Sequence, residues 1–159
     1  MSYIAYLKID GIDGDCSDAA HRGWMLLDSF NQNVCGPQER GGRTTLSEFA
    51  LTKLSDASTP QLARATAEGR HFQEAVVELC LIGDTKQKFM EIRMTNARIL
   101  SYGLSGSPQS DARTPYENMM IQFEKVEWLY FPNAFAPDPP KEPVVCRADW
   151  SSDPLPALQ

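Results

Sequence analysis

Apolar and polar residues alternate along most of this chain, and this alternation restricts its fold more than any other feature of the sequence. One face of the run 72–81 consists of Ala75, Val77, Leu79 and Leu81, and the next run carries Met90, Ile92 and Met94 on one face. Successive side chains of a strand point to opposite sides, so a period of two predicts strands with one face toward a core. Residues 83–86 (GDTK) predict the reversal between these two strands.

A further run, residues 119–130, changes its phase. Met119, Ile121 and Phe123 follow one alternation, whereas Val126 and Trp128 follow the other. A shift of one residue moves every side chain to the opposite face, so we expect a bulge or a swap of faces near residues 124–125.

Only one segment predicts a helix. Ser58 or Thr59 can accept hydrogen bonds at its start, Pro60 suits the first turn, and Gly69 can adopt the left-handed terminating conformation after residues 61–68. Long alternating strands with a single short helix predict an all-β fold, an antiparallel β-barrel with one short flanking α-helix.

The chain has 159 residues, which suffice for one domain with a substantial core. We assign residues 1–131 to the barrel. Residues 132–159 hold most of the 11 prolines and are expected to form a proline-rich C-terminal arm of low order within the same domain, with Val144, Val145 and Trp150 as its anchors.

Charge and hydropathy exclude several classes of partner. The net charge is −6, and nucleic-acid affinity depends on clustered Lys and Arg, so we expect no nucleic-acid partner. No stretch reaches about 18 consecutive apolar residues, which predicts no membrane insertion. The first ten residues lack the basic and apolar regions of a secretory signal peptide, so any export would be unconventional.

The sequence predicts no catalytic, cofactor-binding or metal-binding residue. The acidic segment 13–18 fails the calcium-loop pattern, because Asp18 and Trp24 occupy the positions that require Gly and Glu. His21 and His71 belong to no metal or catalytic motif, and residues 105–107 (SGS) lack the G-x-S-x-G frame of a hydrolase nucleophile. The four cysteines are far apart and form no C-x-x-C pair, so we expect free thiols and no enzymatic activity.

Four blocks resemble one protein family in order along the chain. They are residues 14–24 (GDCSDAAHRGW), 49–62 (FALTKLSDASTPQL), 69–75 (GRHFQEA) and 117–126 (ENMMIQFEKV). Together they resemble the Hcp family (hemolysin-coregulated protein), the tube protein of the bacterial type VI secretion system. The block 49–62, which joins a strand to the helix, is the most specific of the four.

The resemblance implies a homo-hexameric ring, stacked rings that form an ejected tube, and effectors carried in the lumen. Its partners would be a contractile sheath, a spike protein and the secreted effectors, with assembly in the bacterial cytoplasm and export to the medium or a target cell without a signal peptide.

Two segments become candidate functional sites through this resemblance. Ser29 and Asn31 alternate with Phe30 and would face the lumen, where effectors bind. A loop too long for a hairpin turn would make the contacts between stacked rings, and it comprises Cys35, Gly36, Pro37, Gln38, Glu39, Arg40, Gly41, Gly42 and Arg43.

Other classes remain open at this point. A monomeric lipocalin-like β-barrel would bind a small apolar ligand in its mouth. A hydrolase on a β scaffold would need a triad or a metal that the sequence does not display.

Overall fold

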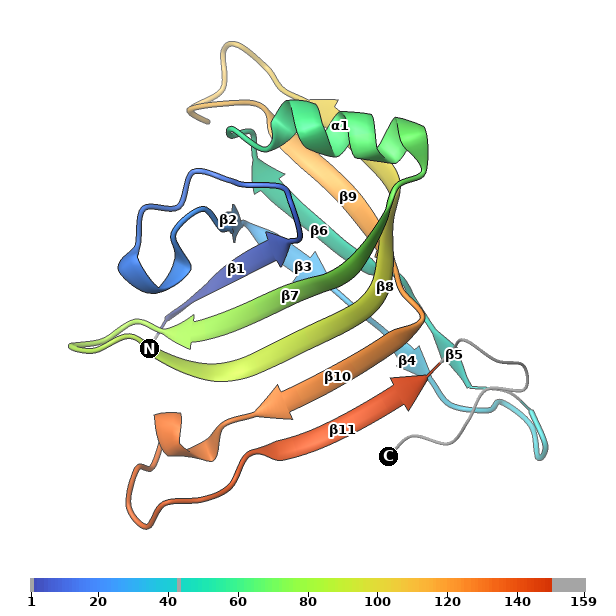
Figure 1. Cartoon of the computed structure of the whole chain (residues 1–159), viewed down its shortest axis with the longest axis vertical. Coiled ribbons are helices and arrows are strands. Elements are labelled where there is room, and N and C mark those ends of the chain that lie inside the picture. Colours follow the sequence, from blue (N-terminus) through green and yellow to red (C-terminus); the bar gives the residue numbers. More distant parts are fainter. Residues whose placement is uncertain (1, 43, 150–159) are drawn as a thin grey trace.

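The computed structural model describes residues 2–42 and 44–149, and β-strands dominate these residues. Eleven strands and one α-helix follow each other along these described residues, and Figure 1 shows their arrangement. Their bounds are β1 (Tyr3–Ile9), β2 (Met25–Leu27), β3 (Ser29–Asn31), β4 (Val34–Cys35), β5 (Thr45–Leu46), β6 (Phe49–Leu54), α1 (Thr59–Glu68), β7 (His71–Leu81), β8 (Gln87–Ser105), β9 (Tyr116–Gln122), β10 (Lys125–Tyr130) and β11 (Val144–Asp149). Two 3₁₀ turns, η1 (Ala19–His21) and η2 (Pro132–Ala134), complete the described elements.

All strand pairs are antiparallel, and the main sheet runs in the order β2-β1-β7-β8-β9-β6-β3. The predicted all-β class with one short helix is therefore confirmed. The strand order is an open path and not a closed ring of hydrogen-bonded strands. Its two ends, β2 and β3, are separated only by Asp28, whose N–H donates to the Thr52 carbonyl at 2.8 Å. The continuous chain at Asp28 thus connects the two edges of the sheet.

The sheet branches at β8, which is 19 residues long. One half of β8 pairs with β9 and the other half pairs with β10, whose outer neighbour is β11. The chain changes from β9 to β10 at residues 123–124, where the predicted phase switch lies. Met119 and Val126 are both buried in the core, so the break keeps both alternations on the inner face.

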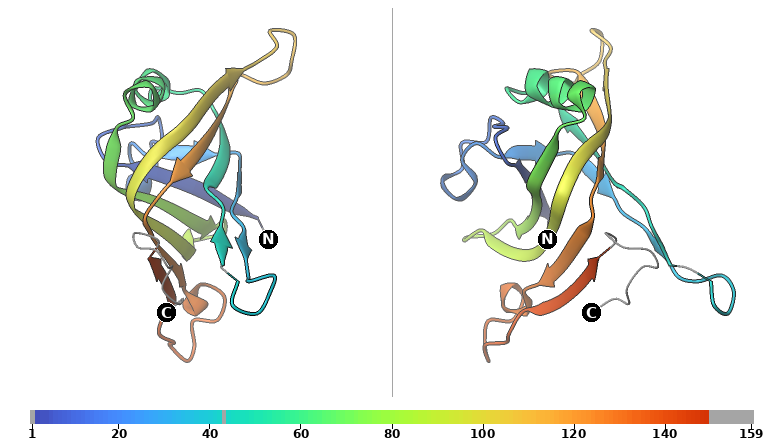
Figure 2. Two further views of the ribbon diagram at one scale, coloured as in Figure 1. Left: turned by 90° about the vertical axis from the view of Figure 1, so that its right-hand side faces the viewer. Right: turned by 45° about the vertical axis from the view of Figure 1, so that its right-hand side comes forward.

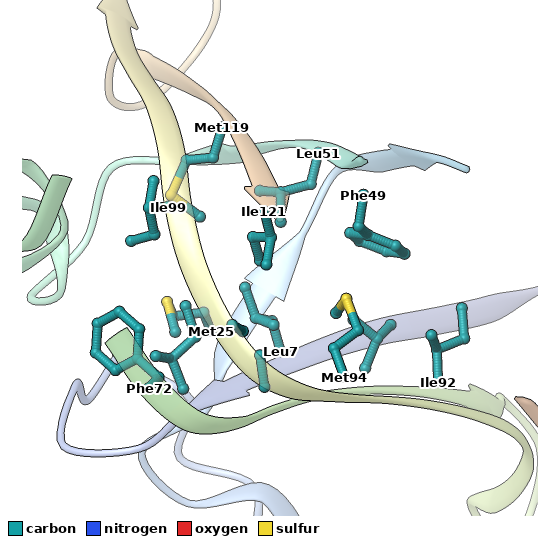
Figure 3. Packing of buried hydrophobic residues seen from close by; sticks show 14 of the residues in the cluster. Leu7, Met25, Phe49, Leu51, Phe72, Ile92, Met94, Ile99, Met119 and Ile121 are labelled. Atoms are coloured by element: carbon teal, nitrogen blue, oxygen red, sulfur yellow. The ribbon is translucent and has the colours of Figure 1, made fainter. Parts of the chain in front are cut away.

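The core fills the interior of the barrel with apolar side chains (Figure 3). Leu7, Met25, Phe49 and Met94 have no measurable exposure, and they come from four different strands. An interior packed in this way leaves little room for the small apolar ligand of a lipocalin-like protein.

Helix α1 ends as predicted, because Gly69 has φ 64° and its N–H donates to the carbonyls of Ala65 and Thr66. The predicted N-terminal cap is right in its position and wrong in its hydrogen bond. Ser58 is the N-cap residue, but its side chain makes no capping hydrogen bond. The Ser58 hydroxyl donates to Asp56, and the Thr59 hydroxyl donates to Glu117, a residue of β9.

The described part of the C-terminal arm, residues 132–149, contains a strand that its prolines did not predict. Val144–Asp149 form β11, which pairs with β10 along its full length. Val145 is half-buried, whereas the side chain of Val144, the other predicted anchor on this strand, is exposed. Trp150 lies outside the described residues. Within the described chain, no helix is both long and apolar enough to cross a bilayer.

Candidate functional site

The first candidate surface is an uncharged strip on the outer side of β3, β6 and β9. Ser29 and Asn31 are exposed, whereas Phe30 between them stacks on Phe49 with 5.8 Å between ring centroids. The structure therefore places Ser29 and Asn31 on one face, away from the core. Antiparallel pairing sets Ser29 opposite Thr52 and Asn31 opposite Ala50.

Short hydrogen bonds orient the side chains of this strip. The Ser29 and Thr52 hydroxyls are 2.6 Å apart, and the Asn33 amide donates to Asn31 Oδ1 at 2.9 Å. The strip forms the floor of a hollow of about 430 Å³, to which β8 and β9 add Ser101, Asn118, Met119 and Met120. The ten described lining residues are all uncharged, so the hollow offers hydroxyl, amide and thioether groups to a partner and no fixed charge.

The second candidate surface is the hairpin of β4 and β5, which projects from the barrel (Figure 2, right). Residues 35–42 are all exposed. A turn closes the tip, where the Gly42 N–H donates to the Glu39 carbonyl at 2.8 Å. A Cβ atom placed on Gly36 or Gly41 would have no neighbour within 4 Å. Arg43, the last residue of the predicted stacking loop, lies outside the described residues.

The hairpin is anchored at its base. The Asn33 N–H donates to Ser47 Oγ at 2.8 Å, and the Ser47 N–H donates to the Asn33 carbonyl at 2.9 Å. The Trp128 indole on β10 donates to Gln32 Oε1 at 2.9 Å. The attachment to the barrel is therefore fixed, while the described residues of the tip, 36–42, are exposed.

A buried ionic cluster joins β6, β9 and the start of α1, and sequence reasoning missed it. Lys53 and Glu117 have fully buried side chains, and Lys53 Nζ donates to Glu117 Oε1 at 3.2 Å, to Asp56 Oδ1 at 3.0 Å and to the Leu54 carbonyl at 3.0 Å. Burial and the adjacent Glu117 carboxylate raise the pKa of Tyr102 to about 12, so its phenol stays neutral at physiological pH.

Two signals in the sequence pointed to this cluster. Lys53 continues the alternation of Phe49 and Leu51, which are both buried, so its position predicts burial. It also lies in the block 49–62, the most specific part of the family resemblance. Its partner Glu117 is 64 residues away, and no local pattern connects the two.

Comparison with known proteins gives the family. Residues 6–130 match the sequence model of the family described as "Type VI secretion system effector, Hcp". The chain is 26% identical over 140 residues to the protein hcp1 of Pseudomonas aeruginosa strain PAO1, a match that covers 83% of this chain and 85% of that protein.

Solved structures agree in fold. Hcp1 from Salmonella typhimurium superposes with a TM-score of 0.79 at 21% identity, covering 94% of this chain and 96% of that one. A type VI secretion system effector from Yersinia pestis superposes with a TM-score of 0.73 at 21% identity, covering 91% and 98%. Since the family model spans most of the sequence, the chain belongs to the Hcp family of the type VI secretion system.

Proposed function

We propose that the chain is a structural, non-enzymatic tube subunit, which closes into hexameric rings that stack into an ejected tube and carry effectors in the lumen. Family membership is the observation that carries this proposal. A packed barrel with a fixed, projecting hairpin supports it, because a tube subunit needs rigidity and repeated self-contact. A closed ring also needs two different complementary patches on each subunit.

The partners in this proposal are the contractile sheath, the spike protein and the secreted effectors. The subunit would assemble in the bacterial cytoplasm and leave with the ejected tube, reaching the medium or a target cell without a signal peptide.

Light scattering coupled to size-exclusion chromatography tests ring formation. We expect a particle of six times the subunit mass of 17.8 kDa. A monomer at micromolar concentration would contradict the ring.

We assign the uncharged strip around Ser29 and Asn31 to effector contact in the lumen. Ser29→Lys and Asn31→Lys place bulky charges there, and we expect normal rings that no longer retain a co-expressed effector, as measured by co-purification. Ser107→Lys, in the exposed β8–β9 connection, is the matched control and should retain the effector. Collapse of the ring in the strip variants would show that these two residues are structural.

We assign the loop Cys35–Arg43 to contacts between stacked rings. Replacing residues 36–42 with a short Gly-Ser turn should leave rings of normal size and melting temperature but stop tube formation and secretion. A Gly-Ser replacement of equal length is the control, because it separates the effect of loop length from the effect of the loop's side chains. Normal tubes from the shortened protein would contradict the assignment, and loss of the ring would place the loop in the lateral interface.

A further inference from the structure

Three side chains with metal-binding atoms meet on the outer side of β7. His21 Nε2 lies 2.7 Å from Glu78 Oε2 and 4.0 Å from Cys80 Sγ. The three ligand atoms all lie within 4.8 Å of one another. The His21 side chain is 5% exposed and the Glu78 side chain 17%, and Cys80 is buried. The cluster is therefore enclosed and is not a solvated group of surface charges.

The fold brings the three residues together for simple reasons. Glu78 and Cys80 are two residues apart on one strand, so they share a face. The loop between β1 and β2 covers this face and places His21 over it through η1. The His21 ring stacks on Tyr6, with 3.8 Å between centroids and 3° between planes, and it meets the Trp24 ring edge-on at 4.8 Å.

Neighbouring side chains hold two of the three ligands, and His21 Nδ1 is buried with no hydrogen-bond partner among the described residues. A ligating carboxylate is normally held by a further hydrogen bond, and Lys88 Nζ provides one to Glu78 Oε1 at 3.3 Å. A hydrogen bond usually also fixes a ligating imidazole. Here the stack on Tyr6 and the edge of Trp24 fix the plane of the His21 ring.

The combination of one nitrogen, one oxygen and one sulfur donor favours Zn²⁺. This ion accepts imidazole, carboxylate and thiolate ligands in tetrahedral geometry, whereas Ca²⁺ and Mg²⁺ take oxygen ligands. Zinc–ligand bonds of about 2.0–2.3 Å place tetrahedral ligands about 3.3–3.8 Å apart, so small side-chain adjustments would fit the ion between these three atoms.

We propose that His21, Glu78 and Cys80 bind one Zn²⁺ ion through Nε2, Oε2 and Sγ, with a water molecule as the fourth ligand. The thiol proton of Cys80 passes to solvent as the Zn–S bond forms. His21 gives up the Nε2 proton that it shares with Glu78 and carries a proton on Nδ1 instead, so the neutral imidazole offers Nε2 to the ion. Glu78 exchanges its hydrogen bond to His21 for a bond to the metal. The ion thereby ties the loop between β1 and β2 to β7. This site goes beyond the tube function and differs from the sequence-based expectation of a chain without metal.

The test uses the full chain, stripped with a chelator and dialysed. Native mass spectrometry with added Zn²⁺ should show one bound ion per chain, and Ca²⁺ should show none. Co²⁺ should produce the near-ultraviolet charge-transfer band of a thiolate–metal bond. Cys80→Ser should remove that band and weaken Zn²⁺ binding by at least about 100-fold, because it removes a direct ligand.

Cys146→Ser and Cys35→Ser are the controls, since these thiols lie on β11 and β4. Both variants should keep one Zn²⁺ per chain and the cobalt band. If Cys80→Ser does not fold, Glu78→Gln preserves shape and hydrogen bonding and should still weaken Zn²⁺ binding. A folded wild-type chain that binds no Zn²⁺, or zinc binding that survives Cys80→Ser or Glu78→Gln, would overturn the proposal.

Discussion

The hairpin loop of residues 36–42 and the segment that joins β6 to α1 are close in the sequence, yet they differ in burial and in their contacts with the barrel. The joining segment, residues 53–59, contains Lys53, whose side chain is completely buried. Lys53 Nζ donates to Asp56 and Glu117, and the Thr59 hydroxyl also donates to Glu117. The hairpin loop is exposed throughout. The joining segment is therefore held within its own subunit, while the loop is free to serve a contact outside the subunit.

The largest effect should follow from breaking the buried ion pair. Lys53→Met leaves the Glu117 carboxylate buried without its cation, and we expect a loss of about 3–5 kcal/mol in the free energy of unfolding. Urea denaturation measures this loss. Lys125→Met, on β10 and 56% exposed, is the control and should change stability by less than about 0.5 kcal/mol.

The double variant Lys53→Met/Glu117→Leu sharpens the same point. It replaces both charges with apolar groups, so it should recover much of the loss. A cost below about 1 kcal/mol for Lys53→Met alone would show that the cluster does not stabilise the fold, and the contrast with the hairpin would fail.

A pair of glycines allows a matched test of intermediate size. Gly69 at the end of α1 and Gly41 in the hairpin loop both have positive φ, 64° and 80°. Alanine is disfavoured there by about 1–2 kcal/mol. We expect Gly69→Ala to cost about that much, and Gly41→Ala to cost almost nothing because the exposed loop can relax. Equal losses in thermal unfolding would mean that the loop is as constrained as the helix end.

The smallest effect should come from lengthening the loop. Inserting four Gly-Ser residues after Gly41 adds only a logarithmic entropy cost, less than about 0.6 kcal/mol for a loop that is not doubled. Denaturant midpoints should therefore coincide with those of the wild type. A loss above 1 kcal/mol would show that the loop packs on its own subunit.

The sequence predicted those parts of the fold that depend on local periodicity. The alternation of 75–81 and 90–94 corresponds to β7 and β8, and Gly69 ends the helix as expected. The reversal at residues 83–86 lies between the two strands. These features are set by side-chain direction and backbone freedom within a few residues.

Features that depend on distant partners could not be predicted. The phase switch near residue 124 indicated a break, but the branch at β8 arises because β9 and β10 pair with two different halves of that strand. Ser58 and Thr59 bind Asp56 and Glu117 instead of capping the helix.

The candidate sites also differ in whether they depend on local periodicity or on distant partners. Alternation placed Ser29 and Asn31 on one face, as the structure has them, whereas their role stays a prediction that rests on the family. His21 and Glu78 are 57 residues apart, so the spacing gave no sign that they meet.

The long strand β8 has a mechanical consequence. It is hydrogen-bonded to β7 along most of its length, and on its other side β9 and β10 succeed each other without a gap of more than a few residues. A force along the strand axis would load these bonds together in shear, whereas a force across it would open them one after another. A subunit built around such a strand therefore resists axial pull through many hydrogen bonds at once.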